Sequence, residues 1–373
     1  MSFSDDTAEQ DKPPSLRLKP PKPWLVALLA NVKEHDWVQP PDLPPDFGAD
    51  YDYIETIDTI RAAIESGGHK TVFLQADRHL PYALQEVKPD ICFNIAEGLG
   101  GDAREAQTPA LLELLGIPYT GSRVLANAIA LDKPLTKRIW RERGLPVGPF
   151  QEFFTADDRL SPDLEFPLFV KPAREGTGMG VDSKAKVSSE AELRERVEYI
   201  LKFYKQPALV ETFLPGREFT VGQLGRPGAA RYSFHPEWYA EDGFHRLPIL
   251  ELDSRRAATP GIYSHAAKSA MVGTDGAPLY LCPADIEPDF ADHLHQIAIQ
   301  AHQAIGALDV SRVDFRLDAK GQACMLEINP LPGLTPGYSD LCIQAAAEGI
   351  AYEDLILEIL YLGASRWGLV ELT

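Results

Sequence analysis

Short apolar runs separated by amphipathic stretches fill the first third of the 373-residue chain. The runs 24–30 (WLVALLA), 71–76 (TVFLQA) and 90–98 (DICFNIAEG) have the length and composition of strands. An amphipathic stretch at 55–66 and a shorter one before residue 90 have the pattern of helices. Alternation of strands and helices is typical of a parallel sheet with crossover helices. The pattern therefore predicts an N-terminal α/β domain.

The remainder of the chain has a mixed pattern. Residues 166–181 have the pattern of strand, glycine-rich loop and strand, and residues 208–225 that of strand, turn and strand. Helices are expected at 131–144, 191–205, 289–306, 340–350 and 352–366. This mixture predicts α+β domains after the α/β domain.

The same pattern suggests soft domain boundaries near residues 122 and 222. Residues 1–22 are polar and rich in Pro, Lys and Asp, so we expect a flexible tail there. Three domains are expected to follow, at 23–122, 123–222 and 223–373. The Pro-rich segment 39–48 has polyproline II character, which suits a partner-binding segment or, more simply, a surface loop that lengthens the first domain.

Composition and charge narrow the function classes. Apolar residues make up 45% of the chain, which indicates a globular protein. The net charge of −19 argues against nucleic acid or an anionic membrane as the main partner, because both bind basic surfaces. No apolar run has the length of a membrane span or forms the core of a signal peptide. Four scattered cysteines without a Cys-x-x-Cys motif argue against a disulfide framework or a zinc site and indicate a reducing, cytoplasmic location.

A carboxylate and an amide stand on alternate residues in the segment MLEINPLPG (325–333). Glu327 and Asn329 would face the same side of a strand. Just upstream, Arg312 and Asp314 are also two residues apart, and a short turn would join the two strands as a hairpin. Such a hairpin brings both carboxylates and the amide together with the arginine beside them. Oxygen ligands near phosphate are the usual environment of Mg²⁺, so the pattern predicts a magnesium site.

A glycine-rich loop, KPAREGTGMGV, follows the strand that ends near Lys171. Gly176, Gly178 and Gly180 allow backbone N–H groups to turn toward phosphate oxygens, and Lys171 can reach the same phosphates. The loop matches neither the dinucleotide-binding fingerprint nor the P-loop. A glycine loop alone is a weak signal, and a mobile turn is the alternative interpretation.

Two carboxylates, Glu211 and Glu218, flank the turn in LVETFLPGREFTV. Taken alone, they are two solvated acids. Beside a phosphate-binding loop, they become candidates for hydrogen bonds to an adenine amine and to ribose hydroxyls. Phe213 and Leu214 would offer the base an apolar contact.

The order of these segments resembles the ATP-grasp superfamily, and most closely the D-alanine–D-alanine ligase family. Five segments are similar to motifs of that family in their residues and in their order along the chain: ALLELLGIPYTGS, LDKPLTK, GREFTV, RVDFRLD and LEINPLPGLTP. The resemblance covers residues 90–362 well and 24–89 loosely. It implies an ATP-grasp fold, α/β and α+β, in which an N-terminal parallel-sheet (pre-ATP-grasp) domain precedes two subdomains that clasp ATP between two sheets.

The resemblance implies an ATP-binding set. In it, Lys133 and Lys171 contact the ATP phosphates, and the glycine-rich loop closes over them. Glu211 meets the adenine, and Glu218 meets the ribose. The positions are Lys133, Lys171, Glu175, Gly176, Thr177, Gly178, Gly180, Glu211, Phe213, Leu214 and Glu218.

The resemblance also implies a reaction centre. Lys268 matches a lysine that contacts the terminal phosphate, Arg312 would stabilise the transferring phosphoryl group, and the Gly333 N–H would serve an oxyanion. Loops 176–180 and 253–273 are expected to be lids, since an acyl phosphate must be kept from water. Two Mg²⁺ ions, which Mn²⁺ could replace, would be held by Asp314, Glu327 and Asn329.

The departures from the family pattern fall on the amino-acid pockets. The family's Ser-x-Glu-x-x-Val-Ser motif is missing where LLANVKEHDW follows the first strand. A family histidine aligns with Glu97, which we predict as the replacement carboxylate for a substrate ammonium. The serine that holds the second substrate's carboxylate aligns with Tyr338, and Ser339 is one step away.

These observations predict an ATP-dependent carboxylate–amine ligase that joins amino acids through an acyl phosphate, with altered amino-acid pockets. Two alternatives stay open: a true D-alanine–D-alanine ligase of cell-wall synthesis that has drifted in sequence, and an ATP-grasp phosphotransferase. A non-catalytic ATP-binding module is disfavoured, because no metal ligand or phosphate lysine is missing. We expect small amino-acid or amine substrates and neither nucleic acid nor membrane as a partner, and we leave homodimer formation open.

Overall fold

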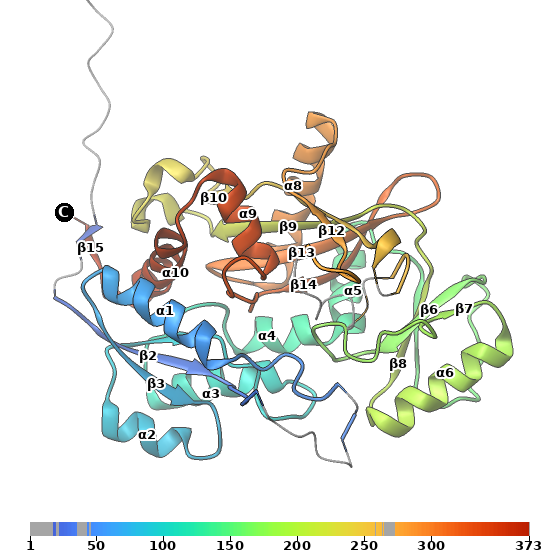
Figure 1. Cartoon of the computed structure of the whole chain (residues 1–373), viewed down its shortest axis with the longest axis horizontal. Helices are drawn as coiled ribbons and strands as arrows, with labels where there is room; N and C mark the ends of the chain where they lie inside the picture. Colours follow the sequence, from blue (N-terminus) through green and yellow to red (C-terminus); the bar gives the residue numbers. More distant parts are fainter. Residues whose placement is uncertain are drawn as a thin grey trace, which may run out of the picture.

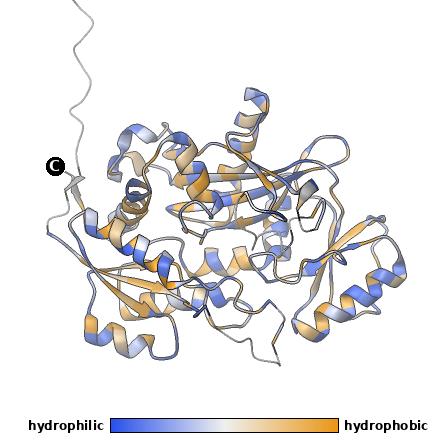
Figure 2. Cartoon of the chain, in the orientation of Figure 1, coloured by the Kyte–Doolittle hydropathy of each residue, from blue (hydrophilic) through white to orange (hydrophobic). Residues whose placement is uncertain are grey.

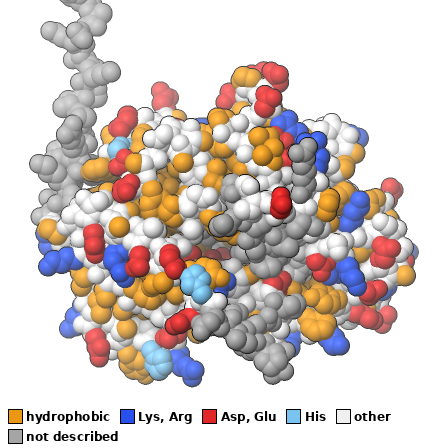
Figure 3. All heavy atoms as spheres, viewed as in Figure 1, with side chains coloured by type: hydrophobic (Ala, Val, Ile, Leu, Met, Phe, Trp, Pro, Cys, Tyr) orange, Lys and Arg blue, Asp and Glu red, His pale blue; other side chains and the backbone are white. Residues whose placement is uncertain are grey.

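The computed structural model describes residues 18–19, 22–35, 43–44, 46–257, 259–262, 264 and 273–372. Within them, three larger sheets form an N-terminal, a central and a C-terminal layer (Figure 1). No helix among these residues is long and apolar enough to cross a membrane. Acidic and basic side chains are interspersed over the described part of the face in Figure 3.

Three parallel strands make the N-terminal sheet, in the order β3-β2-β4. The strands are β2 (Leu25–Ala30), β3 (Lys70–Gln75) and β4 (Ile91–Asn94). The helices of this region are α1 (Ile54–Ser66), α2 (Leu80–Val87), the 3₁₀ helix η1 (Arg104–Ala106) and α3 (Gln107–Leu115). Because helices cover a parallel sheet, its strands are continuous apolar runs, and β2 and β4 are buried along almost their whole length. The predicted α/β domain is confirmed.

The central sheet has four strands in the order β5-β8-β6-β7, all antiparallel neighbours. They are β5 (Phe150–Phe153), β6 (Leu168–Pro172), β7 (Lys186–Val187) and β8 (Ala208–Thr212). Helix α6 (Glu190–Phe203) starts at the cap Ser189, whose side chain accepts from the Glu192 N–H, and its apolar face packs on the sheet (Figure 2). The glycine-rich stretch lies in the connection between β6 and β7.

The C-terminal sheet runs β12-β11-β9-β13-β14, with β10 also paired to β9. Its strands are β9 (Glu218–Gly225), β10 (Phe244–Arg246), β11 (Leu250–Asp253), β12 (Leu279–Leu281), β13 (Val310–Leu317) and β14 (Ala323–Asn329). Short 3₁₀ helices, η2 (Ala229–Tyr232), η3 (Pro236–Trp238) and η4 (Ser254–Arg256), lie in its connections. The predicted strands 208–225 therefore belong to two different sheets, and the predicted boundary at 222 falls inside β9.

Three helices pack on the C-terminal sheet or on one another beside it: α4 (Val124–Leu131), α5 (Lys133–Glu142) and α8 (Pro288–Ile305). The helix predicted at 131–144 corresponds to α5, and α4 precedes it. Asp132 separates them because its carboxylate caps α5 by accepting from the Leu135 N–H, and Pro134 suits the first turn that follows.

The last two helices, α9 (Asp340–Glu348) and α10 (Tyr352–Arg366), agree with the predicted pair. Helix α10 lies beside α1 (Figure 1), and its residues share one apolar core with β2 and β4. The C-terminus therefore binds the N-terminal layer to the rest of the molecule. Within the predicted tail, β1 (Leu18–Lys19) pairs with β15 (Glu371–Leu372).

Candidate active site

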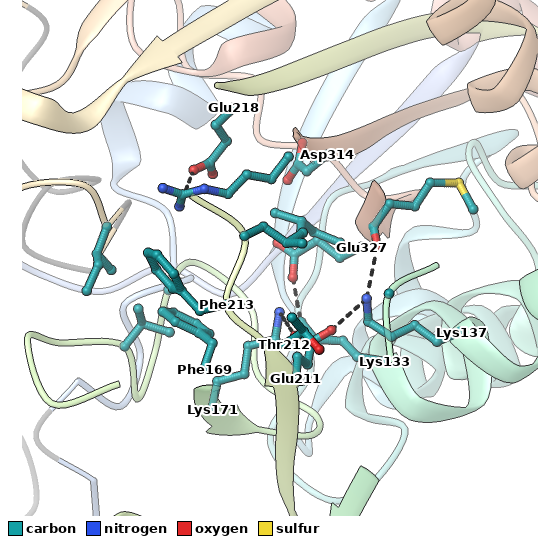
Figure 4. Close-up of a pocket in the computed structure, with 18 of the residues that line it drawn as sticks. Lys133, Lys137, Phe169, Lys171, Glu211, Thr212, Phe213, Glu218, Asp314 and Glu327 are labelled. Carbon is teal, nitrogen blue, oxygen red and sulfur yellow. Dashed lines mark hydrogen bonds and ion pairs between the residues drawn. The ribbon is translucent and has the colours of Figure 1, made fainter. Parts of the chain in front are cut away.

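A cleft with an empty volume of about 960 Å³, its open mouth included, lies between the central and C-terminal sheets. Strands β6 and β8 form one wall, β9, β13 and β14 the other, and α5 contributes from the side (Figure 4). Ten predicted positions line it: Lys133, Lys171, Glu175, Gly178, Glu211, Phe213, Leu214, Glu218, Asp314 and Glu327.

Lys133 is the first residue of α5, and its position follows from the local sequence. Its backbone N–H donates to the Ala173 carbonyl at 3.2 Å, which joins the start of the helix to the end of β6. Its Nζ donates to the Glu175 carbonyl and lies 3.4 Å from the Glu327 carboxylate. The ammonium therefore stands between the start of the glycine-rich loop and the strand β14.

The carboxylate of Glu211 lies between two lysines. Its oxygens are 2.8 Å from Lys137 Nζ and 3.1 Å from Lys171 Nζ. Burial opposes ionisation of Glu211, but the two ammonium groups outweigh it and lower its pKa to about 2. Burial opposes the charge of Lys171 too, yet Glu211 and Glu327 together raise the pKa of Lys171. At Lys137 burial prevails and lowers the pKa.

The predicted hairpin forms between β13 and β14. Asp314 is paired in register with Glu327, and Arg312 with Asn329, before a register shift between Asp314 and Phe315. Arg312 Nε donates to Asp314 at 3.0 Å, and Asn329 Nδ2 donates to the same carboxylate at 3.3 Å. The hairpin thus brings together the four side chains that the alternating pattern had paired.

The Asp314 carboxylate has further support from the neighbouring strand. Thr220 on β9, opposite Asp314 in the register, donates its hydroxyl to it. Arg312 also lies 3.4 Å from Asp340, at the start of α9. The strand register explains the contact between Thr220 and Asp314, whereas the contact between Arg312 and Asp340 depends on where α9 packs.

The far end of the cleft combines an acid with apolar side chains. Glu218 forms an ion pair of 3.1 Å with Arg316, whose guanidinium also donates to the Gly261 carbonyl at 2.7 Å. The Phe213 ring lies under Lys186 Nζ, 4.3 Å from its centroid, and 5.5 Å from the Arg316 guanidinium carbon. This end can accept a flat, apolar group with polar edges.

The glycine-rich loop contributes unevenly to the cleft. Gly178 and Met179 line it, whereas Gly176, Thr177 and Gly180 lie in the same loop outside the lining. Gly178 and Gly180 both have positive φ, 69° and 71°, so glycine is the residue that fits each turn.

The predicted substrate residues form two groups apart from this cleft. Glu97 follows β4, where burial and the charges of Glu105 and Asp50 raise its pKa well above its ordinary value, with Arg104 opposing them. Ser339 precedes α9, and its hydroxyl accepts from the Thr335 N–H at 3.0 Å.

Gly333 lies next to Ser339: a Cβ added at Gly333 would be 2.8 Å from the serine hydroxyl. Tyr338 is 39% exposed, and burial of the rest of its side chain together with Asp340 and Tyr53 raises its pKa. Ser339 is therefore the member of the Tyr338–Ser339 pair that lies against Gly333.

Lys268 lies outside the described residues, as do residues 258, 263 and 265–272 of the lid predicted at 253–273. The sequence did not single out Lys137 and Arg316, which line the cleft, or Thr220, which is buried behind Asp314. Lys137 carried a signal, since it is four residues after Lys133 and so lies on the same helix face. Arg316 also carried one, since it continues the alternation of Arg312 and Asp314. Thr220 carried none, because its contact depends on strand pairing.

Comparison with known proteins agrees with this geometry. The family model described as "D-ala D-ala ligase C-terminus" matches residues 139–361. The chain is 37% identical to a D-alanine–D-alanine ligase of Bordetella avium, over 67% of this chain and 71% of that protein. It is 35% identical to D-alanine–D-alanine ligase B of Chromobacterium violaceum, over 74% and 82% respectively.

Two further comparisons extend the likeness. An uncharacterized protein of Sinorhizobium fredii is 32% identical, over 83% of this chain and 88% of that protein. The crystal structure of D-alanine–D-alanine ligase from Bacillus anthracis complexed with ATP superposes with a TM-score of 0.67 at 21% identity, over 91% of this chain and 98% of that one. That structure shares the fold, and the sequence relatives show the family.

Proposed function

Because this chain belongs to the D-alanine–D-alanine ligase family, whose members are ATP-grasp ligases that form carbon–nitrogen bonds, we propose that it joins an amino-acid carboxylate to an amine through an acyl phosphate, in amino-acid pockets that differ from the family pattern. One observation carries the proposal. Asp314 and Glu327 face each other on a hairpin that lines the same cleft as Lys133 and Lys171.

The cleft suits ATP. Phosphoryl transfer to a carboxylate brings two anions together, so catalysis requires cations held in place. Lys133 and Lys171 supply them, and the carboxylates of Glu327 and Glu211 hold their ammonium groups in place within a buried site. Phe213 and Leu214 would contact the base, while Glu218 would bind the ribose. The Glu211 carboxylate would accept from the adenine amine while it holds Lys171.

The hairpin also suits Mg²⁺. Asp314, Glu327 and Asn329 offer two carboxylates and an amide oxygen from facing strands, which is the hard-oxygen donor set that Mg²⁺ takes and Mn²⁺ accepts. When bound, the ions would neutralise phosphate charge. Arg312 holds the Asp314 carboxylate in place and would act on the transferring phosphoryl group; Lys268 is proposed for the terminal phosphate.

We place the ammonium of the first substrate near Glu97. Burial and the neighbouring acids Glu105 and Asp50 raise the pKa of the Glu97 carboxyl well above its ordinary value, against the opposing effect of Arg104, and so disfavour its ionised form. A bound ammonium would reverse this by favouring the ionised form. E97Q should therefore raise KM for the carboxyl-donor amino acid and leave KM for ATP unchanged; equal effects on both would contradict this role.

We place the second substrate near Gly333 and Ser339. The Gly333 N–H would stabilise the oxyanion formed when the amine attacks the acyl phosphate. The Ser339 hydroxyl, which lies against Gly333, would bind the second carboxylate, with Tyr338 at the entrance.

The partners that follow are small amino acids or amines. All four cysteines are free thiols, which supports a reducing, cytoplasmic location. Homodimer formation stays a prediction that light scattering would test.

The decisive experiment measures ADP release by the purified protein with Mg²⁺-ATP, over single and paired D- and L-amino acids, with the product mass read for each active combination. Turnover that requires an amine and yields the amide supports the ligase. D-Alanine alone giving its dipeptide would identify a true D-alanine–D-alanine ligase. ADP release that is indifferent to every amine would overturn the ligase and favour a phosphotransferase.

A further inference from the structure

A short segment of the N-terminal region, residues 46–50, reaches across to the central sheet. Successive turns make it compact: the Ala49 N–H donates to the Asp46 carbonyl at 3.0 Å, and the Tyr51 N–H donates to the Gly48 carbonyl at 3.1 Å. Lys33, three residues after the end of β2, donates from Nζ to the same Gly48 carbonyl at 2.7 Å. Ala49 packs against the apolar core of the central sheet. The segment is therefore anchored to both layers.

Asp46 connects this segment to the glycine-rich loop. Its Oδ2 accepts from the Gly180 N–H at 2.6 Å, and its Oδ1 accepts from the Tyr204 hydroxyl at 2.8 Å. The residues are 134 positions apart for the first contact and 158 for the second. An ionised acceptor makes a hydrogen bond about twice as strong as a neutral one, so the contact can fix the loop in position.

Gly180 has contacts at its Cα, its N–H and its carbonyl. Its φ is +71°, and a Cβ there would lie 2.4 Å from Pro172 Cγ, the last residue of β6. Its carbonyl accepts from Arg196 on α6, which lies 3.2 Å from Asp182. Both peptide groups of Gly180 are thus bound, the carbonyl from within the central subdomain and the N–H by Asp46.

The same segment also holds the other end of the loop. Asp50 forms an ion pair of 3.0 Å with Arg104, which lies 3.2 Å from the Glu175 carboxylate. Arg104 also donates to the Arg174 carbonyl at 2.9 Å. Residues 46–50 therefore reach the loop at its start, through Arg104, and at its end, directly.

A loop with three glycines has many conformations, and ordering it costs conformational entropy whenever it closes over a ligand. Contacts that order it beforehand lower the cost of binding. The hydrogen bond from the Gly180 N–H to Asp46 orders the end of the loop in this way, next to Gly178 and Met179, which line the cleft.

We infer that Asp46 is a positioning residue for the glycine-rich loop, which it holds in the ATP-binding conformation from the N-terminal layer. This rests on the proposed binding of ATP phosphates by that loop. Asp46 does not line the cleft, so it would act through the Gly180 N–H.

The test compares D46A, D46N and a control, D77A. The Asp77 carboxylate also accepts a backbone N–H, that of His79 at 2.7 Å, within its own turn and away from the loop. Hydrogen exchange of peptides covering residues 173–182 is measured without ATP, and KM and kcat are measured with it. In D46A we expect exchange to rise about tenfold and KM for ATP to rise about tenfold, with kcat changed less than threefold.

The conservative variant separates positioning from general stability. The side-chain amide in D46N keeps an oxygen for the Gly180 N–H, so this variant should recover most of the wild-type KM for ATP, and D77A should match wild type in both measurements. Exchange in D46A equal to wild type would overturn the inference, and so would faster exchange with an unchanged KM. If D46A does not fold, D46S, whose side chain is polar but shorter, replaces it, with the same expected rises in exchange and in KM for ATP and the same overturning results.

Failure of the proposed function gives a different result. In that case Mg²⁺-ATP would not protect residues 173–182 of the wild-type protein from exchange. The ATP-free comparison of wild type with D46A would still show whether Asp46 holds the loop, while positioning for ATP would be overturned with the function.

Discussion

Lys137 Nζ lies 2.8 Å from the Glu211 carboxylate, and the two side chains are nearly shielded from solvent, with residue exposures of 1% and 9%. The same carboxylate neutralises Lys171 at 3.1 Å. Removing one member of a buried ionic group leaves an uncompensated charge, which costs more than the intact group contributes. Glu211 therefore adds a buried ionic link between α5 and β6.

E211Q should lower the free energy of unfolding by about 3 kcal/mol at pH 7, because the ionised form of Glu211 is favoured in the folded state. Its pKa is lowered to about 2, below the value near 4.3 of an unfolded chain. The stabilisation of the folded state by ionised Glu211 is thus complete above about pH 4.3 and is lost as the pH falls toward 2. Urea unfolding at several pH values measures it, with the exposed Glu353 as the control variant E353Q. Equal stability of E211Q and wild type at neutral pH would refute the prediction.

The hairpin was predictable because its information is local. Arg312 and Asp314, and Glu327 and Asn329, are pairs at the two-residue period of a strand, and one turn separates the strands. The chemistry of the proposed magnesium site follows from the side-chain types alone. The strand and helix pattern of the N-terminal layer was predictable for the same reason.

Other features depend on contacts between distant segments. The position of Glu211 between Lys137 and Lys171 depends on how α5 packs beside β6 and β8, and no spacing encodes it. The hydrogen bond from Gly180 to Asp46 joins a Pro-rich segment to a loop 134 residues later. Helix α4 was not predicted, because its sequence VLANAIAL is apolar almost throughout and shows no amphipathic period.

Asp52 should weaken the folded state at neutral pH. Burial and Asp50 raise its pKa to about 7, with Lys33 opposing them. A carboxyl whose pKa is raised on folding costs no stability below its unfolded pKa near 4, and the cost grows as the pH rises to about 7. D52N should therefore raise Tm at pH 8 and not at pH 4. Thermal unfolding at pH 4 and at pH 8 measures the change in Tm, with D58N on the exposed face of α1 as the control. A gain in Tm of equal size at the two pH values would contradict the prediction.

Removal of a hairpin carboxylate should change the metal requirement. D314N is expected to raise the Mg²⁺ concentration for half-maximal ADP release at least tenfold, about 1.4 kcal/mol, because an amide is a weaker ligand than a carboxylate. EDTA should abolish turnover of the wild type, and Mg²⁺ or Mn²⁺ should restore it. D289N, in the first turn of α8, is a matched control. A Mg²⁺ dependence identical in D314N and wild type would exclude Asp314 as a ligand.

Gly333 should tolerate a side chain once its neighbour is shortened. A Cβ there would meet the Ser339 hydroxyl at 2.8 Å, and the next atom, Ser339 Cβ, at an ordinary 3.6 Å. G333A should therefore lower kcat about tenfold by displacing that hydroxyl from the Thr335 N–H, and G333A/S339A should recover kcat to the level of S339A. The backbone N–H at position 333 is present in all of these variants, so recovery is expected if Gly333 acts through that N–H. A double variant as slow as G333A would show instead that the space at Gly333 is itself required, and would remove the argument for its N–H.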